Sequence, residues 1–201
     1  MREKVLIYIH GKGGSAGEAD HYRSLFPDRD VIGLDYRAQT PWDAAEEFPK
    51  LFDVACEKYK SVVLVANSIG AYFAMNALWD KPIEKAYFIS PVVDMPQLIT
   101  DMMAWANVTE DKLREKGEIE TAFGETLFWD YLCYAREHPV RWTVPTHILY
   151  GEKDHLMSLQ TISAFAEQIH ATLTVMPGGE HWFHTEDQMA FLKYWIKQQG
   201  E

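Results

Sequence analysis

The sequence predicts an α/β fold: a doubly wound, mainly parallel six-stranded sheet with helices on both faces. Six short apolar runs are each suited to a strand that is buried on both faces. Stretches with helical periodicity separate these runs, and short strands joined by helices indicate crossovers between parallel neighbours. The expected strands are residues 5–9, 31–35, 62–66, 86–90, 146–150 and 173–176.

The first two strands lead into a loop and two expected helices. The first strand ends in His10 and in a loop with three glycines in four positions, residues 11–14, whose backbone can approach a ligand closely. Residues 17–26 are expected to be helical. The Thr40-Pro41 pair is typical of a helix start, and Pro49 predicts that this second helix is kinked or split.

A tight turn of small residues connects the third strand to the next helix. The strand runs straight into Ala66-Asn67-Ser68-Ile69-Gly70, and an apolar helix then continues to about residue 79. Small residues on both sides of Ser68 let the strand and the helix approach closely, which lifts the serine out of the sheet. A hydroxyl displayed there is suited to act as a nucleophile.

The region at about residues 94–143 differs from the rest of the chain because it contains no convincing strand. We expect one domain, residues 1–201, in which this region is a helical insert between the fourth and fifth strands. One helix is expected to begin at Thr109, and residues 127–135 also show helical spacing. The insert is rich in thioether and aromatic side chains: Met95, Met102, Met103, Trp105, Phe123 and Trp129.

The last two expected helices carry capping signals. Ser158 is placed to cap one helix, and Thr185 with Gln188 forms a capping box for the other. The expected inner face of the first is Leu159, Ile162, Phe165 and Ile169. That of the second is Met189, Phe191, Leu192, Trp195 and Ile196.

Composition limits the classes of function. The net charge of −11 argues against a surface that binds nucleic acid. No apolar run approaches the ~20 residues that span a bilayer, and no signal peptide is recognisable, so a cytoplasmic location is expected. Cys56 and Cys133 lie among apolar neighbours, which predicts buried free thiols in a reducing compartment. Nothing in the pattern indicates an oligomeric state.

Three residues suited to nucleophilic catalysis follow different strands, in the order Ser68, Asp154 and His181. In an open parallel sheet, ligands bind beyond the carboxyl ends of the strands. A serine hydroxyl needs a base, histidine can take and return its proton, and a carboxylate orients the imidazole. Four other residues compete for the roles of acid and base: Asp35, Asp94, His10 and His184.

These motifs resemble those of the α/β-hydrolase superfamily, and the resemblance extends over nearly the whole chain. Residues 66–70 resemble its G-x-S-x-G nucleophile elbow, with Ala66 in place of the first glycine. Residues 10–14, 151–154 and 178–183 resemble its oxyanion loop, acid turn and histidine loop. The resemblance implies an α/β-hydrolase fold that lacks the first two strands of larger members, as in small bacterial-type serine hydrolases. It also implies that the backbone N–H groups of Lys12 and Ile69 form the oxyanion hole.

The expected function is hydrolysis of a carboxylic ester of a small to medium, partly apolar substrate through an acyl-enzyme on Ser68. The insert is expected to act as a lid, with a substrate pocket at Met102, Trp105, Met157 and Trp182. A thioesterase, an acyltransferase and a C–C bond hydrolase could use the same residues, and a non-catalytic protein that binds a small ligand is the alternative of another class. No cofactor and no metal are expected, because no carboxylate or cysteine stands at a matching ligand spacing from the histidines.

Overall fold

The computed structural model describes residues 3–199, which form two compact units. The larger unit consists of residues 3–93 and 141–199, and the smaller unit of residues 94–140. No helix in the described part of the chain is long and apolar enough to cross a membrane.

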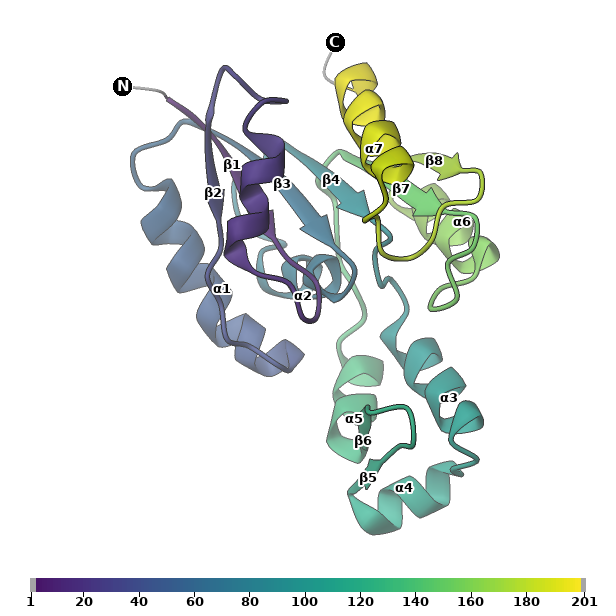
Figure 1. Ribbon diagram of the computed structural model, residues 1–201. Helices are drawn as coiled ribbons and strands as arrows, with labels where there is room; N and C mark the ends of the chain where they lie inside the picture. Colours follow the sequence, from purple (N-terminus) through teal and green to yellow (C-terminus); the bar gives the residue numbers. More distant parts are fainter. Residues whose placement is uncertain (1–2, 200–201) are drawn as a thin grey trace. The chain divides into compact units, whose positions relative to one another are not determined.

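The larger unit is built on a six-stranded sheet in which all neighbouring strands are parallel, in the order β2-β1-β3-β4-β7-β8 (Figure 1). The chain moves from β1 to one edge and then returns to the other side of β1, so the carboxyl ends of β1 and β3 form the switch point where such sheets bind ligands. The predicted doubly wound parallel sheet is confirmed. The strands are β1 (Lys4–Ile9), β2 (Asp30–Gly33), β3 (Ser61–Asn67), β4 (Lys85–Ile89), β7 (Thr146–Gly151) and β8 (Thr172–Met176).

Helices cover both faces of this sheet, as its continuous apolar strands require. On one face, side chains of β1, β3 and β4 pack with residues of the 3-10 helix η1 (Ala16–Tyr22) and of α7 (Glu186–Gln199). The helices α1 (Pro41–Cys56) and α2 (Ile69–Ala77) lie on the opposite face (Figure 1). The helix α6 (Leu159–Gln168) connects β7 to β8.

The capping residues act as predicted, with two differences along the helices. The side chains of Thr40 and Ser158 accept the backbone N–H groups three residues on, and Thr185 and Gln188 bond reciprocally. Of the two outcomes predicted at Pro49, a kink or a split, the split does not occur: α1 is a single helix with Pro49 inside it, and its buried apolar face offsets the lost hydrogen bond. Leu159 is also misassigned to the inner face: it is the first residue of α6 and is 46 % exposed.

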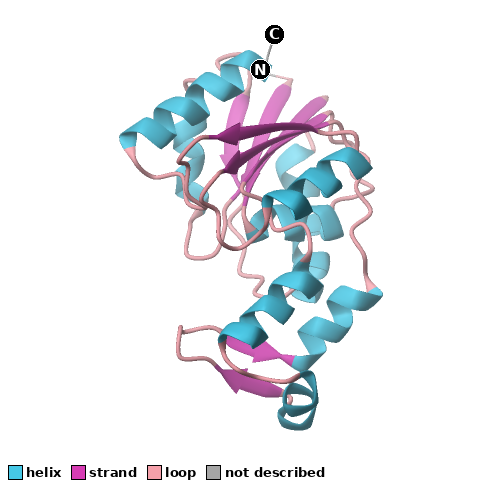
Figure 2. Cartoon of the chain, turned by 90° about the vertical axis from the view of Figure 1, so that its right-hand side faces the viewer, coloured by secondary structure: helices cyan, strands magenta, loops and turns pink. Residues whose placement is uncertain are grey.

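The smaller unit contains a hairpin that the sequence did not reveal (Figure 2). Two three-residue strands pair antiparallel, with Ile119 opposite Leu127, and Gly124 between them has a φ of 85°. Residues 127 and 128, expected at the start of a helix, therefore lie in a strand. The elements are α3 (Met95–Trp105), α4 (Glu110–Lys116), β5 (Glu118–Glu120), β6 (Thr126–Phe128) and α5 (Trp129–Glu137).

The two cysteines are less enclosed than the sequence predicted. Cys56 and Cys133 are free thiols, but both are only half-buried. Burial, Asp53 and Lys81 together set the pKa of the Cys56 thiol at about 11, and burial is the largest cause of this rise. Cys56 is therefore a poor nucleophile at neutral pH.

Candidate active site

Ser68 occupies a strained turn between β3 and α2. Its φ of 49° lies in the left-handed region, which residues other than glycine rarely adopt. Backbone hydrogen bonds hold this conformation: Ser68 N–H donates to the carbonyl of Ile89, and its own carbonyl accepts from Ala71 and Val92. The turn therefore displays the Ser68 side chain at the carboxyl end of β3, next to the switch point.

Gly70 allows the helix α2 to start close to the loop that follows β1. A Cβ atom at Gly70 would lie 2.1 Å from the carbonyl oxygen of His10. A Cβ atom at Gly11 would in turn lie 3.1 Å from the Cβ of Ser68, so the glycine-rich loop is in direct reach of the serine. Gly11 and Gly70 thus allow the carboxyl ends of β1 and β3 to approach each other closely.

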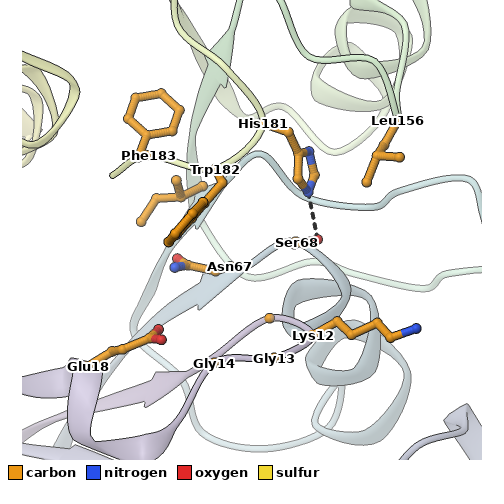
Figure 3. Close-up of a pocket in the computed structure, with 12 residues that line it drawn as sticks. Lys12, Gly13, Gly14, Glu18, Asn67, Ser68, Leu156, His181, Trp182 and Phe183 are labelled. Atoms are coloured by element: carbon orange, nitrogen blue, oxygen red, sulfur yellow. Dashed lines mark hydrogen bonds between the residues drawn. The ribbon is translucent and has the colours of Figure 1, made fainter. Parts of the chain in front are cut away.

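A continuous chain of hydrogen bonds joins Ser68, His181 and Asp154. The Ser68 Oγ lies 2.8 Å from His181 Nε2 (Figure 3), and His181 Nδ1 lies 2.7 Å from Asp154 Oδ2. The Asp154 side chain has no exposed surface, and the His181 side chain is 14 % exposed. Because ionised aspartate can only accept, it selects the imidazole form with a proton on Nδ1, which leaves Nε2 free to accept the Ser68 proton.

The Asp154 carboxylate is held by backbone donors. Its second oxygen, Oδ1, accepts the N–H groups of Leu156 at 2.8 Å and Met157 at 3.4 Å. These bonds compensate the cost of burying the carboxylate and fix its orientation. The turn that carries it is tied to the loop after β8, because the Lys153 N–H donates to the carbonyl of Gly179. The acid and the histidine are therefore positioned as one assembly.

His10 stays outside this chain and shapes the loop after β1. Its Nδ1 lies 2.8 Å from the carbonyl of Gly11, and its ring stacks on Tyr36 at 4.2 Å between centroids. The Tyr36 hydroxyl donates to the His10 carbonyl at 2.8 Å. These contacts hold the glycine-rich loop, whose Lys12 lines the cavity beside Ser68. Ile69 is the first residue of α2, so its N–H has no helical acceptor one turn earlier.

The other candidates for acid and base lie elsewhere. Asp35 is exposed, Asp94 caps α3 through the Gln97 N–H, and the Nδ1 of His184 contacts the carbonyl of Trp182. The hydrogen bonds thus unite only the three residues that the sequence placed first. In the described residues, no three His, Cys, Asp or Glu side chains are grouped so that they could hold a metal ion.

A cavity of about 430 Å³ opens beside Ser68 and His181. Of the predicted pocket residues, Trp182 lines it, whereas Met157 is buried away from it and Leu156 takes its place in the wall. Met102 is half-buried and Trp105 is exposed, both on α3 of the smaller unit.

Sequence reasoning missed Glu18 and Asn67, which also line this cavity. Each had a local signal. Ser15 and Glu18 have the spacing of a capping box, and Asn67 directly precedes the candidate nucleophile. Neither signal says that the two side chains line one cavity beside Ser68, because that depends on how η1 packs on the sheet.

The fold and site together define the class of protein as an α/β-type hydrolase. The model of the alpha/beta hydrolase family matches residues 6–193, and the chain belongs to this family. No significant match exists among curated proteins.

Several solved structures share the fold at low sequence identity. Est1E from Butyrivibrio proteoclasticus is 18 % identical with a TM-score of 0.75, covering 98 % of this chain and 87 % of its own. Est1E has also been solved with ferulic acid bound. Alpha/beta hydrolase domain-containing protein 10 from mouse is 17 % identical with a TM-score of 0.74, covering 97 % of this chain and 88 % of its own.

Proposed function

We propose that this protein is a serine hydrolase that cleaves a carboxylic ester of a small to medium, partly apolar substrate. One observation carries the proposal: Ser68, His181 and Asp154 form an unbroken hydrogen-bonded chain at the switch point of the sheet. The direction of that chain is the one that removes a proton from a serine hydroxyl.

The first half of the reaction forms an acyl-enzyme. Ser68 Oγ attacks the carbonyl carbon of the ester while its proton moves to His181 Nε2. The N–H groups of Ile69 and Lys12 stabilise the negative charge on the carbonyl oxygen. The C–O bond to the alcohol then breaks, and the alcohol leaves with the proton that His181 returns. Asp154 orients the imidazole and stabilises its positive charge.

Water completes the cycle by the same route. His181 removes a proton from a water molecule, whose oxygen attacks the acyl carbon. The bond to Ser68 Oγ breaks, Ser68 recovers its proton from His181, and the carboxylic acid is released. We further propose that the insert acts as a lid whose Met102 and Trp105 contact the substrate. In support of this role, Trp105 and Phe123 are both exposed and form an apolar pair, with 6.1 Å between their ring centroids.

Labelling with an active-site fluorophosphonate, followed by peptide mapping, tests the proposal. We expect one label, on Ser68, and hydrolysis of p-nitrophenyl butyrate that is lost in Ser68→Ala. Absence of label in correctly folded wild-type protein would refute nucleophilic catalysis. Equal background rates for wild type and Ser68→Ala would favour a binding protein instead.

A further inference from the structure

The Glu18 carboxylate lies in the wall of the cavity that contains Ser68. It is half-buried and held in place by the Tyr8 hydroxyl at 2.5 Å and the Ser15 N–H at 3.3 Å. A second cavity of about 430 Å³ shares Glu18, Asn67 and Trp182 with the first. Glu18 therefore stands where two adjacent cavities meet.

The hydrogen bonds beside Glu18 run in one direction, from Asn67 through Tyr8 to the carboxylate. Asn67 Nδ2 donates to the Tyr8 hydroxyl at 3.0 Å, and Tyr8 donates to Glu18. Burial, Tyr22 and the Glu18 carboxylate raise the pKa of Tyr8 far above its ordinary value, so Tyr8 stays protonated. The other amide atom, Asn67 Oδ1, is buried without a hydrogen-bond donor. Because Asn67 Oδ1 is enclosed, the Glu18 carboxylate is the acceptor that this part of the wall offers, while Lys12 lines the first cavity elsewhere and His21 and Lys193 line the second.

No ion pair neutralises Glu18 within residues 3–199. In Figure 3 the Lys12 side chain extends away from it, on the far side of the cavity. Across from Glu18 lies the indole of Trp182, which is 70 % exposed and also lines the cavity. One face of the Trp182 ring is stacked on the His184 ring, with 4.3 Å between centroids, so the other face is the one left for a ligand. A carboxylate and an aromatic face both attract cations.

We propose that Glu18 and Trp182 form a subsite for a positively charged ammonium group of the substrate, so that the preferred esters are cationic. The subsite rests on the proposed function, because it places the charged group beside the ester bond that Ser68 attacks. Glu18 supplies the opposite charge, and Trp182 offers its ring face to the cation. Both contacts are made without displacing a bond of the Ser68–His181–Asp154 chain.

Pairs of esters that differ only in charge test this subsite. The acyl-side pair is p-nitrophenyl 4-(trimethylammonio)butyrate and its neutral isostere p-nitrophenyl 5,5-dimethylhexanoate. The alcohol-side pair is butyrylcholine and 3,3-dimethylbutyl butyrate. We expect wild type to favour the cationic member of at least one pair by about tenfold in kcat/KM, as a partly buried charge pair and a cation–π contact together would give.

Two variants identify the source of the preference. Glu18→Gln keeps an acceptor for Tyr8 but removes the charge, and we expect the preference to fall below about twofold. Glu167→Gln removes the same charge from an exposed position on α6 and should leave the preference intact. A purely structural role of Glu18 would instead lower the rates of both esters equally and leave their ratio unchanged.

Two further measurements apply if Glu18→Gln fails to fold. In wild type, the preference should shrink in about 1 M salt, where charge attraction is screened. Trp182→Leu, at an exposed position, should also reduce it. A preference that neither change affects overturns the subsite.

The outcomes separate this subsite from the proposed function. If wild type hydrolyses both members of each pair equally, the subsite is wrong and the hydrolase proposal stands. If wild type hydrolyses neither and takes no fluorophosphonate label, the hydrolase proposal is wrong. Binding of the esters to Ser68→Ala then decides: tighter binding of the cationic member supports the subsite, and equal binding overturns it.

Discussion

The two units of this chain are stabilised in different ways. In the larger unit, strands such as β1 and β3 are almost completely buried between two layers of helices. In the smaller unit, the described residues form a sheet of two short strands, of which β5 is largely exposed. The side chains of Trp105, Phe123 and Phe128 are also exposed to solvent. The larger unit thus has the deep packing that holds side chains in one geometry.

This difference suggests a division of roles. Ser68 and Asp154 follow β3 and β7, which are buried over most of their length, and such strand ends are fixed points. His181 follows the edge strand β8, and its loop is tied to the Asp154 turn by the hydrogen bond from Lys153 N–H to the Gly179 carbonyl. The smaller unit has less burial to protect it, so its residues can change with a smaller effect on the fold. We therefore expect changes in the larger unit to affect chemistry and stability together, and changes in the smaller unit to affect substrate choice.

The largest effect is expected for Asp154→Asn. The amide can donate to His181 Nδ1 and select the wrong imidazole form, so kcat for p-nitrophenyl butyrate should fall by about 10³- to 10⁴-fold. Asp35→Asn is the matched control, since Asp35 is an exposed acid that follows another strand of the same sheet, β2. A loss in Asp35→Asn as large as that in Asp154→Asn would contradict the assigned role.

Gly70→Ala and Gly124→Ala compare the two units in stability. The new Cβ at Gly70 meets the His10 carbonyl at 2.1 Å, whereas nothing lies within 4 Å at Gly124, which has only a positive φ. Urea unfolding should show a loss of about 3 kcal/mol for Gly70→Ala and about 1 kcal/mol for Gly124→Ala. Similar losses of stability for both variants would mean that the backbone around Gly70 shifts at little cost to make room for the new Cβ.

Leu132→Ala weakens the core of the smaller unit, where Leu132 is fully buried. The cavity should lower the stability of this unit by about 3 kcal/mol. If the insert acts as a lid, KM should rise for a long-chain p-nitrophenyl ester but change little for p-nitrophenyl acetate. An equal change for both esters would argue against the lid.

The smallest effect is expected for Arg136→Gln, on the surface of the smaller unit. The hydrogen-bonded Arg136 guanidinium lowers the pKa of the Glu110 carboxyl below its ordinary value of 4.5. A lowered pKa in the folded state adds stability above that ordinary value, which is lost as pH falls through the folded-state pKa. Thermal unfolding at successive pH values should show that wild type loses a little stability as pH falls through the folded-state pKa of Glu110, and that Arg136→Gln does not. A large difference in stability between wild type and Arg136→Gln at neutral pH would contradict this prediction, because the ion pair is exposed and screened.

Local patterns in the sequence determined most of the larger unit. Apolar runs placed the six strands because a strand buried on both faces cannot tolerate polar residues. Capping side chains marked helix starts at Thr40 and Ser158 because they act on backbone within one turn. The grouping of Ser68, Asp154 and His181 could be predicted because parallel strands bring their carboxyl ends to one edge of the sheet.

A cytoplasmic location stays a prediction.

Only the tertiary structure decided which side chains face Ser68. Glu18 and Asn67 are far apart in the sequence and line one cavity because η1 packs over β1 and β3, a contact that no local pattern encodes. The short hairpin of the smaller unit escaped prediction because three-residue strands are too brief to show a period. Local sequence thus determined the strands and their ends, whereas long-range packing decided the walls of the cavity.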